Sequence, residues 1–431
     1  MKKVYTCFCV EVIHEGHINI INEAAKLGEV TVGVLCDSEM VRYNLFPMKS
    51  LNERIAMISK LPNVKKVIVQ NSIMYDKIFE LEKPDIIVHG DDWKKEPQKV
   101  IRENVLENIK KYGGELVEIP YTYNETVTKI DRQVQQQLAM PEFRRARLKK
   151  LLNIVPIVKT IEVHSGLTGL IAEKTIVASK KGLDQFDAMW VSSLCDSTEK
   201  GKPDIEVVDL TSRMRTINDI MEVTTKPIIF DGDTGGLVEH FVYTVRTLER
   251  IGVSAIIIED KIGLKRNSLF GTEVEQEQDS VEHFSEKIRA GKKVQLTNDF
   301  MIIARIESLI LEKGLDDAIN RAKAYVDAGA DGIMIHSRKT DPTEIFNFCK
   351  AFRLLYSNIP LVVVPTSYNR VTEDELIQNG ANIVIYANQL IRSAFPAMQQ
   401  TAIDILKYHR ALEVNSRIMP IKDVISLIEN L

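Results

Sequence analysis

The strongest constraint on the fold is a series of eight short apolar segments in the C-terminal two thirds of the chain. Each is rich in Ile, Val or Met, as is typical of strands buried on both faces. The segments are KTIEVH, FDAMWVSS, KPIIFDGD, SAIIIED, FMIIARIE, DGIMIHS, PLVVVPTS and NIVIYAN. Helical patterns such as GLDDAINRAKAYVDAGA separate most of them. Eight buried parallel strands alternating with helices over about 280 residues predict a (β/α)₈ barrel, with a doubly wound open sheet as the alternative.

The first 135 residues have a different pattern. Five β-rich runs, KKVYTCFCV, VTVGVLC, KKVIV, DIIVHG and ELVEIP, alternate with helical stretches, which predicts an α/β domain with a parallel sheet. The segment that follows carries no strand signal and is expected to pass into a helix. We therefore predict an N-terminal domain over residues 1–135, a linker and helix over 136–157, and the barrel over 158–431.

Composition narrows the class of partner and the compartment. A net charge of −4 and a pI near 6.1 give no sign of a surface for polyanions, so a nucleic acid partner is not expected. Five cysteines without any C-x-x-C spacing favour reduced thiols and a cytoplasmic location. Glu11 and His14 come too early for a signal peptide, and no apolar run approaches the ~18 residues of a transmembrane helix. We expect a soluble protein with no membrane partner.

Polar side chains gather at the C-terminal ends of the predicted barrel strands, where barrel enzymes build their active sites. They are Trp190, Ser192, Ser193, Asp231, Asp233, Glu259, Asp260, Arg305, Glu307, His336, Ser337, Thr366 and Ser367. The carboxylates of Asp231, Asp233 and Glu259 end successive strands and can converge. Hard oxygen donors with no Cys or His cluster nearby suit Mg²⁺. The alternative for each acid is a helix N-cap on a solvated loop.

The segment KIGLKRNSLFG follows the fourth of these strands. It places two cations, an amide and a hydroxyl between Gly263 and Gly271. That composition suits a mobile lid that brings hydrogen-bond donors to an anionic group. A solvated charged loop is the alternative.

Five of these motifs, FDGDTGG, EDKIGLKRNS, IIARIES, AGADGIMIHSRK and VVVPTSY, resemble successive strand-end motifs of phosphoenolpyruvate mutase, a family of the isocitrate lyase superfamily of barrels. The resemblance covers about residues 158–431, and its most specific part is E-D-K-x-x-x-K-x-N-S from Glu259 to Ser268. The carbon–carbon lyases of the superfamily carry a catalytic cysteine on that loop. This sequence has no cysteine between Cys195 and Cys349, which disfavours lyase activity.

The resemblance implies a role for each candidate residue. It implies a substrate pocket of Trp190, Ser192, Ser193, Leu194 and Ser268, catalytic roles for Asp204, Lys265, Asn267, Arg305 and His336, and a Mg²⁺ site of Asp231, Asp233 and Glu259. The implied reaction is the isomerisation of phosphoenolpyruvate to phosphonopyruvate in phosphonate biosynthesis. The rival is a phosphonopyruvate hydrolase on the same scaffold. The resemblance also implies a homodimer or homotetramer in which a helix around residues 388–412 packs on a neighbouring subunit.

Two departures from the family pattern affect these implied roles. The family's D-T-G-Y-G reads Asp233-Thr234-Gly235-Gly236-Leu237 in this chain, which alters the packing of the loop and keeps its carboxylate. The flanks of Asp204 differ from the usual R-D-x-N-E.

The N-terminal domain carries its own motifs. IHEGHINII is an H-x-G-H element with His14 and His17, and HGDDWKK supplies Gly90, Asp91, Asp92 and Trp93. Together they resemble the cytidylyltransferases over residues 1–135, which implies that CTP binds there and that a phosphonate is activated as its CMP ester. The family's G-T-F-D reads Phe8-Cys9-Val10-Glu11, and its R-T-x-G-x-S-T, at residues 121–127, lacks the arginine. A nucleotide-binding domain without catalysis is the alternative.

Overall fold

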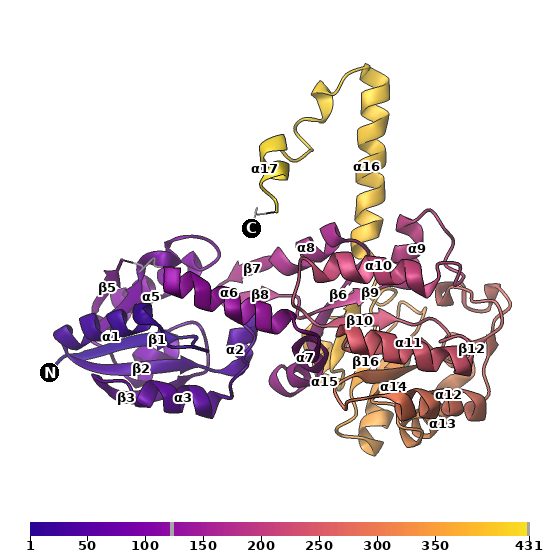
Figure 1. Ribbon diagram of the computed structural model, residues 1–431, viewed down its shortest axis with the longest axis horizontal. Helices are drawn as coiled ribbons and strands as arrows, with labels where there is room; N and C mark the ends of the chain where they lie inside the picture. The colour runs from indigo at the N-terminus through magenta and orange to yellow at the C-terminus, as the bar shows by residue number, and fades with distance from the viewer. Residues whose placement is uncertain (121–124, 429–431) are drawn as a thin grey trace.

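The computed structural model describes residues 1–120 and 125–428, which form two α/β parts lying side by side (Figure 1). Tyr121, Thr122, Tyr123 and Asn124, which begin the segment that departs from the cytidylyltransferase motif, lie outside the described residues. Within the described ranges, no helix combines the length and apolar character needed to cross a membrane.

The N-terminal part is the predicted parallel α/β domain. Its sheet has the order β3-β2-β1-β4-β5. The strands are β1 (Lys3–Phe8), β2 (Glu29–Leu35), β3 (Val64–Gln70), β4 (Ile86–Gly90) and β5 (Glu115–Ile119). The helices are α1 (Glu15–Leu27), α2 (Asp37–Arg42), α3 (Leu51–Ser59), α4 (Asp76–Leu81), the 3₁₀ helix η1 (Asp91–Lys94) and α5 (Lys99–Tyr112). The strand order reverses between β1 and β4, and ligands of such sheets bind outside the strand ends at that point.

Two helices connect this domain to the second part. They are α6 (Glu125–Ala139) and α7 (Pro141–Ile154), so the expected boundary at residue 135 lies inside α6. Helix α7 is bonded to the second part of the chain, since Arg144 donates to the carbonyl of Thr224 at 2.7 Å and Arg147 to that of Thr225 at 2.9 Å.

The second part is a closed barrel of eight parallel strands, and its strands are the eight predicted segments. They are β6 (Val158–Val163), β9 (Ala188–Val191), β10 (Ile228–Asp231), β11 (Ala255–Glu259), β14 (Met301–Ile306), β15 (Gly332–Ile335), β16 (Leu361–Val363) and β17 (Ile383–Tyr386). Strand β6 pairs with both β9 and β17, which closes the ring and excludes the open sheet.

Helices surround the barrel and pack on the outward side chains of its strands. They are α8 (Gly166–Lys174), α9 (Ser193–Glu199), α10 (Leu210–Met221), α11 (Val238–Ile251), α12 (Val281–Val294), α13 (Gly314–Asp327), α14 (Thr343–Leu355) and α15 (Glu373–Gln378). Ile256 and Ile258 join the cluster between strands and helices, while Ile257 joins the cluster inside the barrel with Trp190. Both faces of β11 are therefore buried, which explains its run of isoleucines.

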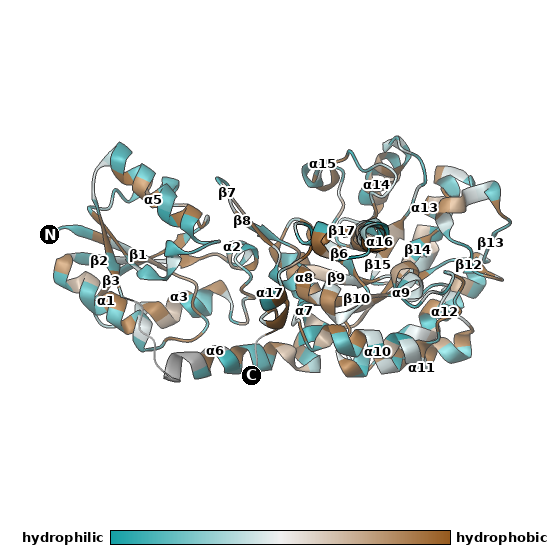
Figure 2. Ribbon diagram, turned by 90° about the horizontal axis from the view of Figure 1, so that it is seen from above, coloured by the Kyte–Doolittle hydropathy of each residue, from teal (hydrophilic) through white to brown (hydrophobic). Residues whose placement is uncertain are grey.

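Three additions extend beyond the barrel. A hairpin of β7 (Ile176–Ser179) and β8 (Gly182–Gln185) reaches the N-terminal domain beside α2, as both views show (Figure 2). There Leu183 packs in one cluster with Met40 and Ile73. The lid segment forms the hairpin β12 (Lys261–Ile262) and β13 (Glu277–Gln278) around the 3₁₀ helix η2 (Ser268–Glu273). The C-terminal segment consists of α16 (Gln389–Tyr408), η3 (Leu412–Val414) and α17 (Ile421–Ile425), and α16 projects away from the barrel (Figure 1).

Candidate active site

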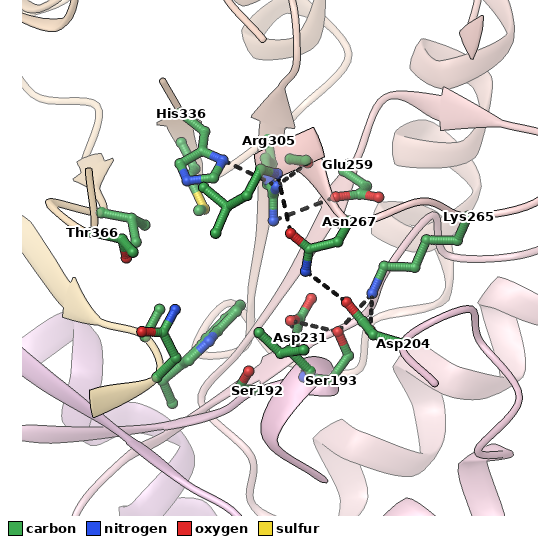
Figure 3. A pocket seen from close by; sticks show the side chains of 18 residues that line it. Ser192, Ser193, Asp204, Asp231, Glu259, Lys265, Asn267, Arg305, His336 and Thr366 are labelled. Atoms are coloured by element: carbon green, nitrogen blue, oxygen red, sulfur yellow. Dashed lines mark hydrogen bonds and ion pairs between the residues drawn. The ribbon is translucent and has the colours of Figure 1, made fainter. Parts of the chain in front are cut away.

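A cavity opens at the C-terminal ends of the barrel strands, where the sequence predicts the site (Figure 3). Its lining includes all the predicted substrate and catalytic residues and two of the three predicted metal ligands. They are Trp190, Ser192, Ser193, Leu194, Asp204, Asp231, Glu259, Lys265, Asn267, Ser268, Arg305 and His336. The further lining residues are Leu269, Met334, Val364, Thr366, Ala387 and Asn388.

The floor of the cavity holds Asp231 in a fixed orientation. The loop after β9 turns into α9 with Ser192 as the N-cap, and this turn directs both the amide and the hydroxyl of Ser193 to Asp231 Oδ2, at 3.0 and 2.9 Å. Burial opposes ionisation of Asp231, but Lys265 and the nearby guanidinium groups outweigh it and keep its pKa below the usual value. Asp231 is therefore an oriented carboxylate. The Ser193 donors bind this carboxylate, and their expected contact with substrate stays a prediction.

The lid is joined to the cavity wall by Lys265. Its ammonium donates to Ser193 Oγ at 2.8 Å, to Asp204 Oδ1 at 2.6 Å and to Asp233. Asn267 donates to the other oxygen of Asp204 at 2.9 Å. Burial alone would lower the pKa of Lys265, but the surrounding carboxylates raise it above the usual value, so the lysine stays charged.

Asp233 does not line the cavity with the other two predicted metal ligands. Its carboxylate lies behind Asp231, paired with Lys265 and with Arg213 at 3.4 Å. Arg213 comes from α10 and also donates to the main-chain carbonyl of Asp231. Asp233 thus pairs with two cations that also contact Asp231 or the lid, and its expected role at the metal, mostly through metal-bound water, stays a prediction.

Arg305 connects the lid to the opposite wall of the cavity (Figure 3). Its guanidinium donates to Ser268 Oγ at 2.6 Å and to His336 Nδ1 at 3.3 Å, and it lies 3.3 Å from Glu259. A guanidinium only donates, so Nδ1 of His336 is the unprotonated ring nitrogen and Nε2 carries the proton. Burial, helped by Arg305, lowers the pKa of His336 to about 3. The imidazole is neutral at physiological pH.

The charges at the end of β11 serve two purposes. Glu259 faces the cavity, and burial raises its pKa against the opposing effect of Arg305. Asp260 points the other way, is fully buried, and accepts hydrogen bonds from Tyr325 at 2.7 Å and Arg321 at 3.1 Å. One acid of the pair therefore belongs to the site, and its neighbour anchors the base of the lid.

A second cavity lies in the N-terminal domain, outside the ends of β1 and β4. His14 caps α1, with its Nδ1 accepting the amide of Gly16 at 3.1 Å. The ring of His17 lies 3.9 Å from that of His14, and burial together with His14 lowers the pKa of His17 to about 3. Phe8 packs edge-on against His17 at 4.9 Å and lines the same cavity. Gly90 and Asp92 also line this cavity.

The structure corrects the expected role of Trp93. Its side chain is buried beneath the cavity and donates to Glu118 at 2.8 Å, while His89 stacks on it with ring centres 3.7 Å apart. The ring of His89 lines the cavity in its place, and Asp91 is likewise absent from the lining. Trp93 is a packing residue because η1, which follows β4, directs its indole N–H to Glu118 in β5.

Comparison with known proteins assigns both parts of the chain. Residues 148–406 match the family described as phosphoenolpyruvate phosphomutase. The chain belongs to this family. The phosphoenolpyruvate phosphomutase of Tetrahymena pyriformis is 33% identical over 285 residues, which is 66% of this chain and 91% of that protein. Residues 7–142 match the family described as cytidylyltransferase-like.

Relatives of the phosphomutase barrel include a hydrolase. The phosphonopyruvate hydrolase of Variovorax sp. (strain Pal2) is 34% identical over 262 residues, 60% of this chain and 89% of that protein. The crystal structure of a phosphonopyruvate hydrolase in complex with oxalate and Mg²⁺ superposes with a TM-score of 0.59 and 31% identity, covering 66% of this chain and 94% of the other.

The donor set of the barrel cavity fits a hard divalent cation. Asp231 and Glu259 present carboxylate oxygens to it. Glu259 Oε1 is buried, and among the described residues none donates a hydrogen bond to it, although Lys261 Nζ lies 3.2 Å away. Lys261 balances the charge of this oxygen, so the fit to a metal rests on the chemistry of the two carboxylates that line the cavity. Oxygen ligands that leave room for water are those that Mg²⁺ prefers.

Sequence reasoning missed two kinds of phosphomutase site residue. Ala387 and Asn388 end the eighth predicted strand, so the strand-end rule would have found them. Arg213 had no such signal, since it lies within α10, where an arginine in a helical pattern usually faces solvent.

Proposed function

We propose that the barrel interconverts phosphoenolpyruvate and phosphonopyruvate in phosphonate biosynthesis. The observation that carries this proposal is the bonding of the lid residues Lys265 and Asn267 to Asp204 above the carboxylates of the floor. An enol phosphate must be enclosed during this reaction, because water would otherwise take the phosphoryl group. The bonds of Lys265 and Asn267 to Asp204 fix the lid, and the fixed lid provides that enclosure.

Different residues of the cavity would bind different parts of the substrate. The phosphoryl group leaves the enol oxygen and bonds to the methylene carbon, and its oxygens carry the charge of a largely dissociative transition state. Arg305, Asn267 and the Nε2–H of His336 donate to these oxygens from fixed positions. Trp190 limits the pocket on the pyruvate side. Asp231, directly, and Glu259, through water, would hold Mg²⁺, which when bound stabilises negative charge on the enolate oxygen.

The hydrolase is the competing activity, and one 34% identical relative has that name. Asn267 favours the mutase, since it lines the cavity and donates one N–H of its amide to Asp204, so that its second N–H can bind a transferring phosphoryl group. In a hydrolase, a water molecule must reach the phosphorus instead.

Phosphorus NMR of the full chain with phosphonopyruvate and Mg²⁺ separates the two activities. We expect the phosphonopyruvate resonance to be replaced by that of phosphoenolpyruvate. Asn267→Ala should slow this conversion, whereas exchange of the neighbouring exposed cation, Arg266→Ala, should not. Free phosphate and pyruvate without phosphoenolpyruvate would overturn the mutase assignment in favour of hydrolysis.

For the N-terminal domain, we propose that the second cavity binds CTP and that a phosphonate such as 2-aminoethylphosphonate receives the cytidylyl group. The two histidines support this, because ring N–H groups at the start of α1 can donate to phosphate oxygens beside the positive end of the helix dipole. A phosphonate oxygen would attack the α-phosphorus and release pyrophosphate. Phe8 narrows the cavity beside His17, so we expect the transfer to be slow.

A further inference from the structure

Three side chains with metal-binding chemistry converge beside the turn from β9 into α9. They are Glu162 in β6, His164 just after it, and Cys195 in α9. One donor atom from each lies within 4.8 Å of the others, and all three residues are buried, with His164 the most exposed at 5%. None of them lines the active-site cavity. The proposed reaction therefore leaves this cluster without a role.

Glu162 and His164 also contact neighbours outside the cluster. His164 Nδ1 lies 2.9 Å from Glu162 Oε2, and the other oxygen of Glu162 accepts the amide of Ile391 at 2.8 Å. His164 Nε2 lies 4.0 Å from the carboxylate of Glu199. Metal-binding histidines commonly direct their second ring nitrogen to a carboxylate, which fixes the tautomer and the ring orientation.

The chemistry of the three donors selects the metal. A thiol, an imidazole and a carboxylate are a mixed set that suits Zn²⁺ and is unsuited to Mg²⁺, which takes oxygen ligands. Binding would release the thiol proton, and the thiolate of Cys195 together with the Glu162 carboxylate would balance the two positive charges of the ion. That balance matters because a net charge at a buried site is costly.

We propose that Glu162, His164 and Cys195 bind one Zn²⁺ ion, with water in the fourth position. His164 would coordinate through Nδ1, leaving Nε2–H to face Glu199. The half-exposed Glu199 also marks the side from which the ion can enter.

The location gives this ion a positioning role. Cys195 donates through Sγ to the carbonyl of Ala387 at 3.4 Å, and Ser192 caps the amide of Cys195 at 3.3 Å. Ser192 and Ala387 both line the active-site cavity. Zinc binding would replace the Sγ–H bond to Ala387, and the ion would join the loop after β9, through Cys195 and Ser192, to β6 and α16, through Glu162 and the amide of Ile391. Its removal should loosen substrate binding and lower the melting temperature without removing any group that touches substrate.

Cobalt(II) is the probe for this site, because a thiolate bound to Co²⁺ gives a near-ultraviolet charge-transfer band that oxygen ligands do not. We expect one equivalent of Co²⁺ to give this band in the full-length protein, and Zn²⁺ to abolish it. Cys195→Ser should lose the band, while Cys349→Ser, which changes another buried cysteine, should keep it. Absence of the band in the unmodified protein, or its persistence in Cys195→Ser, would overturn the proposal.

A second variant keeps the test decisive if Cys195→Ser does not fold. Glu162→Gln keeps the hydrogen-bonding shape and removes one ligand charge, so Zn²⁺ affinity, measured by competition with a chromophoric chelator, should fall by about tenfold or more. Unchanged affinity would count against the site. Neither measurement uses phosphonopyruvate turnover, so a failure here is distinct from a failure of the proposed function.

Discussion

The ammonium nitrogen of Lys265 lies 2.6 Å from Asp204 Oδ1, although 61 positions separate the two residues in the chain. This ion pair joins the lid to the loop after α9. Lys265→Met should lower kcat for phosphonopyruvate isomerisation by about 100-fold, comparable with removal of one fixed donor from other active sites. The reason is that the substitution leaves the carboxylates of Asp204 and Asp233 without the cation they share.

The matched control is the neighbouring cation of the same lid. Arg266 is exposed, so Arg266→Met should change kcat by less than about twofold. Equal losses in the two variants would mean that the lid needs positive charge in general and that the Lys265–Asp204 pair has no specific role.

Asp231 provides the second prediction. Asp231→Ala should reduce turnover by about a thousandfold and remove its dependence on Mg²⁺, because a bound metal stabilises the transition state by several kcal/mol. Folding should be little affected, since strand-end carboxylates on this face serve the site. Asp327→Ala, an exposed acid on α13, is the control and should keep full activity. Turnover that persists in excess chelator would contradict the metal assignment.

The success of sequence reasoning followed the strength of the local signal. Buried parallel strands have an apolar signature, and the barrel rule then places their ends together, so the strands and most of the cavity could be predicted. Side-chain direction could not. Glu259 and Asp260 are adjacent acids, and successive side chains of a strand point to opposite faces, so only the register decides which one enters the cavity. The role of Trp93 could not be predicted either, because the motif does not show which way the 3₁₀ helix η1 turns each of its side chains. The contact of Arg213 with the site could not be predicted, because nothing in the sequence pattern of α10 distinguishes this arginine from one that faces solvent.

The buried His336 makes the barrel sensitive to acid. Its pKa in the folded protein is about 3, against an ordinary value of 6.5. Below pH 6.5 the unfolded chain takes up a proton that the folded chain does not bind until about pH 3, so stability falls as the pH drops through this window. Between pH 7 and pH 5, His336 should account for about 2 kcal/mol of lost stability.

Urea unfolding at the two pH values measures this loss. Trp190 reports on the barrel in a Trp93→Phe background, because the chain has only these two tryptophans. His336→Gln should lose less stability between pH 7 and pH 5 than the parent, and the exposed His240→Gln should behave as the parent does. Identical pH dependence in His336→Gln and the parent would refute the assignment of a neutral buried imidazole.

Helix α16 predicts the oligomeric state. It projects from the barrel (Figure 1). It also exposes large apolar side chains, with Met398 at 70% and Leu406 at 73% exposure. An apolar surface of this kind marks a protein interface. We expect a dimer or tetramer in light scattering, and the mass of one chain for the double variant Met398→Glu with Leu406→Glu. Gln399→Glu puts a charge on the same helix and should leave the oligomer intact. A monomeric parent protein would contradict this prediction.

His17 tests the N-terminal domain. Calorimetry of the full chain with CTP and Mg²⁺ should detect binding, and His17→Ala should weaken it by about tenfold or more, because a hydrogen bond to a charged phosphate contributes ~1.5–3 kcal/mol. His17 sits in the cavity beside His14, whereas His240 is exposed on α11 of the barrel, so His240→Ala is the matched control and should bind CTP as the parent does. The structure leaves Phe8 against His17, and Phe8→Gly should therefore improve binding or at least preserve it. No heat at millimolar CTP, or binding indifferent to His17, would leave this domain as a structural partner of the phosphomutase barrel without a nucleotide site.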